Sequence, residues 1–158
     1  MGRGRGGVQH RGGGTRGEPG GGVIRETTAY LEGNELGSLR RWEAADLVSR
    51  ADGIGRELSQ GMTTSQIRNF LDEVNRIEAE TRRDGSNFDS SRVVLLKPLL
   101  AYAAGRETDR NKKEMLTDFA KLFSAAAEKT TDAKDFKKFV DFTRSVVAYH
   151  RFHGGSNR

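Results

Sequence analysis

Apolar side chains recur every three or four positions in several stretches between residues 39 and 153, and no run shows the strict two-residue alternation of a half-buried strand. The spacing therefore predicts an all-α fold, a small five-helix bundle joined by short loops. No repeat of solenoid length is visible. Such a bundle is expected to have no obvious cleft.

The first two predicted helices differ in how clearly the sequence bounds them. Gly53 and Gly55 are expected to end a short first helix, because glycine adopts backbone conformations that other residues avoid. The apolar positions of this helix are Leu39, Trp42, Ala45, Leu47 and Val48. Thr63 and Gln66 match a T-x-x-Q capping box that starts the second helix, which is expected to end near residues 82–85. Its apolar positions are Ile67, Phe70, Leu71, Val74 and Ile77.

The third predicted element, residues 91–105, is apolar almost all round, which is typical of a buried helix at the centre of a core. Pro98 lacks an amide hydrogen and clashes with the preceding turn, so a kink or break is expected between Val94 and Lys97. Two further amphipathic helices follow, with Asp132 as the expected cap between them. Their apolar positions are Met115, Leu116, Phe119, Leu122, Phe123 and Ala126, then Phe136, Phe139, Val140, Thr143, Val146 and Val147.

The N-terminal segment differs in composition from the rest of the chain. Residues 1–22 contain eleven of the twenty glycines and almost nothing apolar, so a disordered Gly/Arg-rich tail is predicted. Its two Arg-Gly-Gly triplets are typical of RNA-contacting segments, although a merely solvated tail is an equally good interpretation. Residues 23–38 are expected to form a variable linker, 39–153 the helical bundle domain, and 154–158 a C-terminal tail.

The net charge of +5 is unevenly distributed along the chain. Residues 1–22 carry +3, residues 23–96 carry −3, and residues 97–158 carry +5. A polyanion is therefore expected at the tail and the C-terminal half, because neutralising its phosphates releases condensed counterions. The chain has no cysteine, no long apolar segment and no signal-peptide pattern, which favours a cytoplasmic protein.

The last predicted helix carries the clearest candidate binding surface. Lys137, Arg144 and Arg151 recur at seven-residue spacing and form a basic ridge, which suits either a solvated face or a phosphate backbone. His150 and His153 could share a metal, but no cysteine or well-placed carboxylate completes a ligand set, so a hydrogen-bonded structural histidine is favoured. No catalytic motif, metal site or cofactor loop is evident, and no enzyme is predicted.

Three stretches together resemble, in the same order, motifs of the small subunit of the type III-A CRISPR effector, the Csm complex. They are TSQIRNF at residues 64–70, LKPLLAYAAGR at 96–106 and VVAYH at 146–150. The chain departs from the family's pattern at Leu99, where a basic residue is common, and in its glycine-arginine tail. The resemblance spans roughly residues 40–153 and is carried by the combination of motifs.

The resemblance implies a non-catalytic, five-helix subunit for antiviral defence that takes no cofactor. It would be present in several copies, stacked head to tail along the guide RNA–target RNA duplex, beside the backbone and large subunits of the complex. Family members bind the RNA backbone without sequence specificity. By this resemblance Arg68, Lys97 and Arg106 are the motif positions expected to face RNA.

Two other functions fit the same residues. One is a helical protein–protein adaptor whose basic face pairs with an acidic partner, and the other is an RGG-tailed RNA chaperone. Glutamate at Lys137, Arg144 and Arg151 would leave RNA association unchanged in an adaptor. Deletion of residues 1–22 would abolish activity only in a chaperone.

Overall fold

The computed structural model describes residues 22–83 and 88–155, and in these ranges all regular secondary structure is helical, with no strand. The all-α prediction is confirmed. The α-helices are α1 (Val23–Glu32), α2 (Ala44–Leu58), α3 (Thr64–Arg83), α4 (Ser90–Val94), α5 (Leu96–Arg106), α6 (Arg110–Glu128) and α7 (Ala133–Phe152), with a 3-10 turn, η1 (Leu39–Arg41), before α2. The count exceeds five because of an extra helix before residue 39 and a break in the third predicted element.

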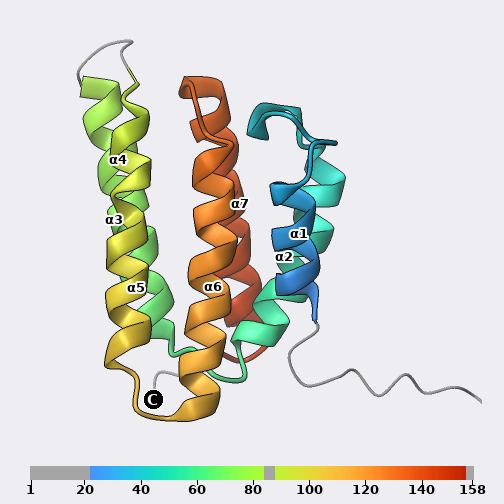
Figure 1. The fold of residues 1–158 in the computed structure, drawn as a ribbon, viewed down its shortest axis with the longest axis vertical. Coiled ribbons are helices and arrows are strands. Elements are labelled where there is room, and N and C mark those ends of the chain that lie inside the picture. Colours follow the sequence, from blue (N-terminus) through green and yellow to red (C-terminus); the bar gives the residue numbers. More distant parts are fainter. Residues whose placement is uncertain (1–21, 84–87, 156–158) are drawn as a thin grey trace, which may run out of the picture.

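The long helices form two layers of three (Figure 1). In one layer α6 packs between α5 and α1, and in the other α7 packs between α3 and α2. The pair α6 and α7 therefore occupies the middle of the bundle, with α3, α4 and α5 to one side and α1 and α2 to the other.

The core is centred on α6 and α7, where Phe123 joins the two layers. Its ring centroid lies 4.6 Å from that of Phe70, 4.7 Å from Phe119, 5.3 Å from Phe142 and 5.8 Å from Phe139. Tilted, edge-on and offset rings at these spacings are favourable arrangements that add to the gain from apolar burial. All five side chains are buried.

The expectation that residues 91–105 form the centre of the core is wrong. Helix α5 lies at the edge of its layer, where its residues Leu99 and Tyr102 are 42% and 65% exposed, and Leu95 just before it is 68% exposed. The predicted break is confirmed at Leu95, between α4 and α5. Pro98 falls in the first turn of α5, where no intrahelical donor is lost.

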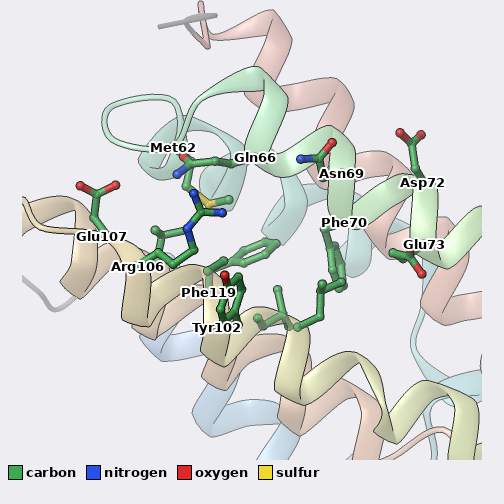
Figure 2. A pocket seen from close by; sticks show the side chains of 14 residues that line it. Met62, Gln66, Asn69, Phe70, Asp72, Glu73, Tyr102, Arg106, Glu107 and Phe119 are labelled. Atoms are coloured by element: carbon green, nitrogen blue, oxygen red, sulfur yellow. The ribbon is translucent and has the colours of Figure 1, made fainter.

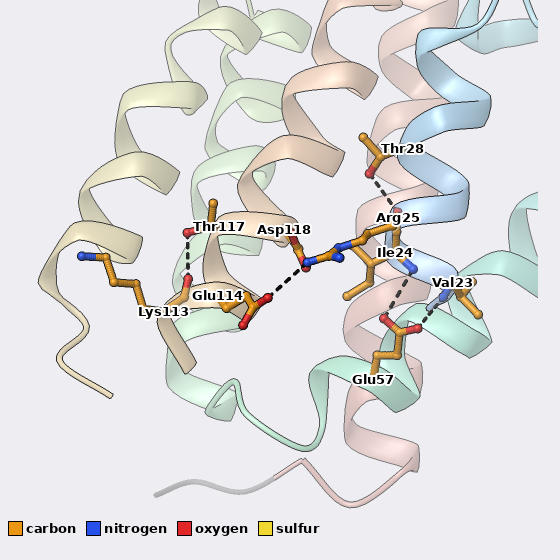
Figure 3. Close-up of polar contacts among 9 residues, drawn as sticks. All are labelled: Val23, Ile24, Arg25, Thr28, Glu57, Lys113, Glu114, Thr117 and Asp118. Carbon is orange, nitrogen blue, oxygen red and sulfur yellow. Dashed lines mark hydrogen bonds and ion pairs between the residues drawn. The ribbon is translucent and has the colours of Figure 1, made fainter. Parts of the chain in front are cut away.

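The stretch predicted to be a variable linker contains α1, which packs on α6 and α2. Ile24 and Leu31 are buried because they share one face of this helix. The carboxylate of Glu57 accepts hydrogen bonds from the backbone N–H groups of Val23 and Ile24, which are otherwise unpaired at a helix start (Figure 3). Arg25 adds ion pairs to Glu114 and Asp118 of α6, at 3.2 and 3.1 Å.

The expected helix end at Gly53 and Gly55 is also wrong, because α2 continues through both to Leu58. Gly55 is buried against α7, where an added Cβ would lie 2.6 Å from the backbone nitrogen of His150. This glycine serves a close approach of two helices and not a turn.

The predicted caps are confirmed by their hydrogen bonds. Thr63 Oγ1 accepts from the backbone N–H of Gln66 at 3.1 Å, and the Gln66 side chain accepts from the N–H of Thr63 at 2.9 Å. Asp132 accepts from the N–H of Asp135 at the start of α7. The tail predicted for residues 1–22 falls almost wholly outside the described residues, as do residues 84–87 and 156–158.

Within the described ranges, none of the helices combines the length and the apolar character needed to cross a membrane.

Candidate nucleic-acid interface

Helices α3 and α7 run antiparallel, and their register follows from contacts at two levels. Thr64 Oγ1 donates to the carbonyl of Gly155 at 3.1 Å, near the start of α3 and just beyond α7. About three turns further along α3, Arg144 Nη2 donates to Asn75 at 3.1 Å. One residue forward on α3 therefore corresponds to one residue back on α7. This register places Arg68 level with Arg151.

Five cations lie along the outer side of these two helices, a surface that we call the α3–α7 face. Its residues are Arg68, Arg82, Lys137, Arg144 and Arg151, and all five are exposed. By the same register Arg82 is level with Lys137. The α7 members extend over about 21 Å of helix axis. Four of the six sequence-predicted site residues are thereby brought to one surface.

The carboxylate of Glu78 is the one ion-pair partner that the described residues give to this face. It accepts from Arg144 at 2.9 Å and lies 3.7 Å from Arg82. In the described ranges no carboxylate lies within ion-pair distance of Arg68, Lys137 or Arg151. The face therefore keeps a net positive charge, which an anionic strand could neutralise.

Arg82 is the one cation of this face that the sequence analysis does not predict as a binding residue, because its position there indicates only the end of a helix. Its side chain is 77% exposed. A signal existed in the sequence: Arg68 and Arg82 are fourteen residues apart, close to four full helical turns, so they project to nearly the same side.

The other two predicted residues, Lys97 and Arg106, lie on α5 and away from this face. Lys97 Nζ is 3.0 Å from Glu128 Oε1, in a shallow groove between α5 and α6 that also carries Lys113 and Lys121. The Arg106 guanidinium lies 5.6 Å from the ring centroid of Tyr102, a cation–π contact.

Contrary to the expectation that the bundle lacks a cleft, a groove of about 630 Å³ runs between α3 and α5. In this α3–α5 groove, Phe70 and Phe119 form the apolar floor, and Tyr102 stands at the α5 side (Figure 2). The buried Leu116 also lines the groove. The polar residues that line it are Gln66, Asn69, Asp72, Glu73, Arg106 and Glu107. The groove lies between two helices of different layers, because α3 packs mainly on α7 and α5 packs mainly on α6.

The two C-terminal histidines have separate partners. His150 is buried with Nε2 2.8 Å from the carbonyl oxygen of Met62, and a carbonyl only accepts, so Nε2 carries the proton. His153 Nε2 lies 2.5 Å from Asp52 Oδ1. Both rings therefore fix the end of α7 against α2 and the turn before α3, which is a structural role. In the described residues no group of three potential ligands could hold a metal ion.

The fold and the α3–α7 face define an all-helical protein whose most distinctive surface is a row of cations. The family model described as Csm2 Type III-A matches residues 41–156, so the chain belongs to the Csm2 family. This family is the structural small subunit of the type III-A CRISPR effector, and other subunits of the Csm complex are therefore its partners. Among curated proteins no match to the chain was found.

Proposed function

We propose that this chain is a cytoplasmic, non-catalytic RNA-binding subunit whose copies stack along the guide RNA–target RNA duplex. The α3–α7 face contacts the ribose-phosphate backbone, and other subunits perform the reactions of the effector. Family membership supports a place in the complex. The observation that carries the RNA contact is the row of five exposed cations, of which three have no acidic partner among the described residues.

The chemistry of this face suits backbone contact and not base reading. Arginine forks and a lysine on rigid helices match phosphate oxygens, which carry the same charge whatever the base. Binding is therefore sequence-independent. If all five cations neutralise phosphates, the affinity falls with salt with a log–log slope of about −3.5 to −4.5.

Lys97 and Arg106 remain proposed RNA contacts, carried by the resemblance alone. Both lie on α5, away from the α3–α7 face, but in different grooves: Lys97 lines the groove between α5 and α6, and Arg106 lines the α3–α5 groove. Lys97 would act together with Lys113 and Lys121, which line the same groove. The pairing of Lys97 with Glu128 would have to be exchanged for phosphate.

The test compares two triple variants that change the net charge equally. The first carries Lys137→Glu, Arg144→Glu and Arg151→Glu, on the α3–α7 face. The matched control carries Arg41→Glu, Arg56→Glu and Lys112→Glu, which lie on η1, α2 and α6 and outside both grooves that α5 lines. All six side chains are exposed, so the fold should tolerate both sets.

We expect the first variant to lose at least about 100-fold in affinity for a guide–target duplex at physiological salt, with a shallower salt slope. The control should lose much less. Equal losses would mean that net charge, and not this face, governs binding. An unchanged affinity in both would favour the adaptor function, and loss only on deleting residues 1–22 would favour the chaperone.

A further inference from the structure

Phe152 is the most exposed large apolar side chain in the described part of the protein, at 77%. It is the last residue of α7, and Arg151 beside it is also exposed. The ring centroids of Tyr149 and His153 lie 6.4 and 5.1 Å from that of Phe152, so the three rings are neighbours at the end of α7. The end of α7 thus presents a protruding aromatic ring next to a positive charge.

The α3–α5 groove has the complementary properties. Its floor is apolar, and its wall includes Leu99, which is 42% exposed for lack of a covering element. Three carboxylates and one guanidinium line it, namely Asp72, Glu73, Glu107 and Arg106. Glu73 is paired with Arg76, and Glu107 accepts hydrogen bonds from its own turn, but the lining remains acidic on balance. On balance such a lining attracts a basic partner.

We propose that Phe152 of one copy inserts into the α3–α5 groove of the next copy, with Arg151 facing the carboxylates of the groove. The groove volume of about 630 Å³ is ample for one phenyl ring. Phe152 does not fill the groove of its own chain, because its side chain is exposed. A second copy fits the groove better than RNA does, because the charge beside the Phe152 ring is positive whereas the groove lining is acidic on balance.

The contact joins two different surfaces, so each pair of copies leaves one free Phe152 and one free groove. A contact of this kind is heterologous, and unless it closes into a ring it extends indefinitely. The inference rests on the proposed function, in which copies stack along RNA, and it names the surfaces that touch. Arg151 then lies where the α3–α7 face meets the contact, so phosphate binding and stacking occur side by side.

The test uses two variants of the full chain that leave its net charge unchanged. Each of them removes one half of the contact. Phe152→Ser removes the ring and keeps the groove, whereas Ala103→Trp fills the groove and keeps the ring, because Ala103 lines it. Val48→Ser is the matched control, since Val48 is an exposed apolar residue on α2. Should Ala103→Trp not fold, Leu99→Asn weakens the groove wall instead.

Sedimentation velocity without RNA is expected to show wild type and Val48→Ser forming dimers and larger species as the concentration rises. Each half variant should associate about 10- to 100-fold more weakly, as expected for losing the burial of one aromatic side chain. An equimolar mixture of the two half variants should recover dimers and nothing larger. Wild-type protein that stops at dimers, or a Phe152→Ser variant that associates like wild type, would overturn the proposal.

Disulfide cross-linking is a second measurement, which detects the contact even at an association too weak for sedimentation. The chain has no cysteine, so Phe152→Cys in one copy and Leu99→Cys in another are the only thiols in a mixture. A mixed disulfide between them is expected under mild oxidation, on RNA and without it, and its absence in both conditions contradicts the contact. Because the RNA-free reactions do not depend on RNA binding, a failure of the proposed function would leave them unchanged.

Discussion

Gly55 is where the packing of α2 on α7 can be tested by adding a single carbon atom. An alanine Cβ at this position would lie 2.6 Å from the His150 nitrogen, 2.7 Å from the Tyr149 carbonyl carbon and 2.6 Å from the Tyr149 Cβ. Ordinary contacts of a Cβ begin near 3.4 Å. Two of the three atoms belong to the backbone, so no side-chain rotation relieves the overlap.

Gly55→Ala therefore forces α2 and α7 apart along the most extensive helix contact of the bundle. Overpacking of this kind costs about 1–3 kcal/mol. The better helix propensity of alanine returns up to about 1 kcal/mol, so the net loss approaches 2 kcal/mol at the upper end. For a domain of this size, that loss lowers Tm by about 4–8 °C.

Gly105→Ala is the matched control, because an added Cβ there meets nothing within 4 Å and the residue lies inside α5. It should raise stability by up to about 1 kcal/mol. Urea unfolding monitored by circular dichroism measures both changes. A Gly55→Ala variant as stable as Gly105→Ala would refute the close approach of the two helices, because both variants gain the helix propensity of alanine and only Gly55→Ala meets an overlap.

Three further changes in stability follow from particular contacts. Thr63→Ala removes the acceptor for the Gln66 N–H and should cost about 1 kcal/mol in urea unfolding. Phe123→Ala removes the ring that joins the two layers and should cost about 3–5 kcal/mol. Phe152→Ala removes an exposed ring and should change stability by less than about 0.5 kcal/mol. Similar losses in the two variants would contradict the assigned core. Burial raises the pKa of Asp135, but hydrogen bonds from the Arg40 N–H and from Thr131 outweigh it, so the pKa is below its ordinary value. The Asp135 carboxylate therefore stabilises the fold above pH about 4, and this stabilisation is lost as pH falls through its folded-state pKa. Asp135→Asn should cost about 1–3 kcal/mol at pH 7. It should also reduce the decrease in the free energy of unfolding that wild type shows at acidic pH.

The sequence predicted those helices correctly whose bounds depend on residues close together in the chain. A single apolar stripe identified α3, α6 and α7, and the capping residues placed the starts of α3 and α7, because a cap depends on hydrogen bonds within a few residues. The break before α5 followed from the chemistry of proline for the same reason.

The predictions that were wrong concern residues whose structure depends on contacts with segments distant in the sequence. Gly55 looks like a helix terminator until α7 is known to pass within contact of it. Helix α1 is short, and the acceptor that stabilises its start, Glu57, belongs to another helix. An all-round apolar helix suggests the centre of a core, but α5 lies at the edge and keeps its outer side exposed.

The candidate site shows the same division. Seven-residue spacing predicted that Lys137, Arg144 and Arg151 share one side of a helix, and the structure places them so. That Arg68 joins them depends on the antiparallel register of α3 and α7, which no local pattern encodes. Lys97 and Arg106 were grouped with them by resemblance, and the fold places both on another helix.

The most direct test of RNA binding by the α3–α7 face is to map where RNA touches the free subunit. Backbone amide chemical shifts recorded during titration with a short guide–target duplex would provide that map. We predict that the perturbed residues concentrate on the outer side of α3 and α7, around Arg68, Arg144 and Arg151, and that the perturbations fade as salt is raised. Perturbations confined to α5 and α6, or spread evenly over the bundle, would contradict the account.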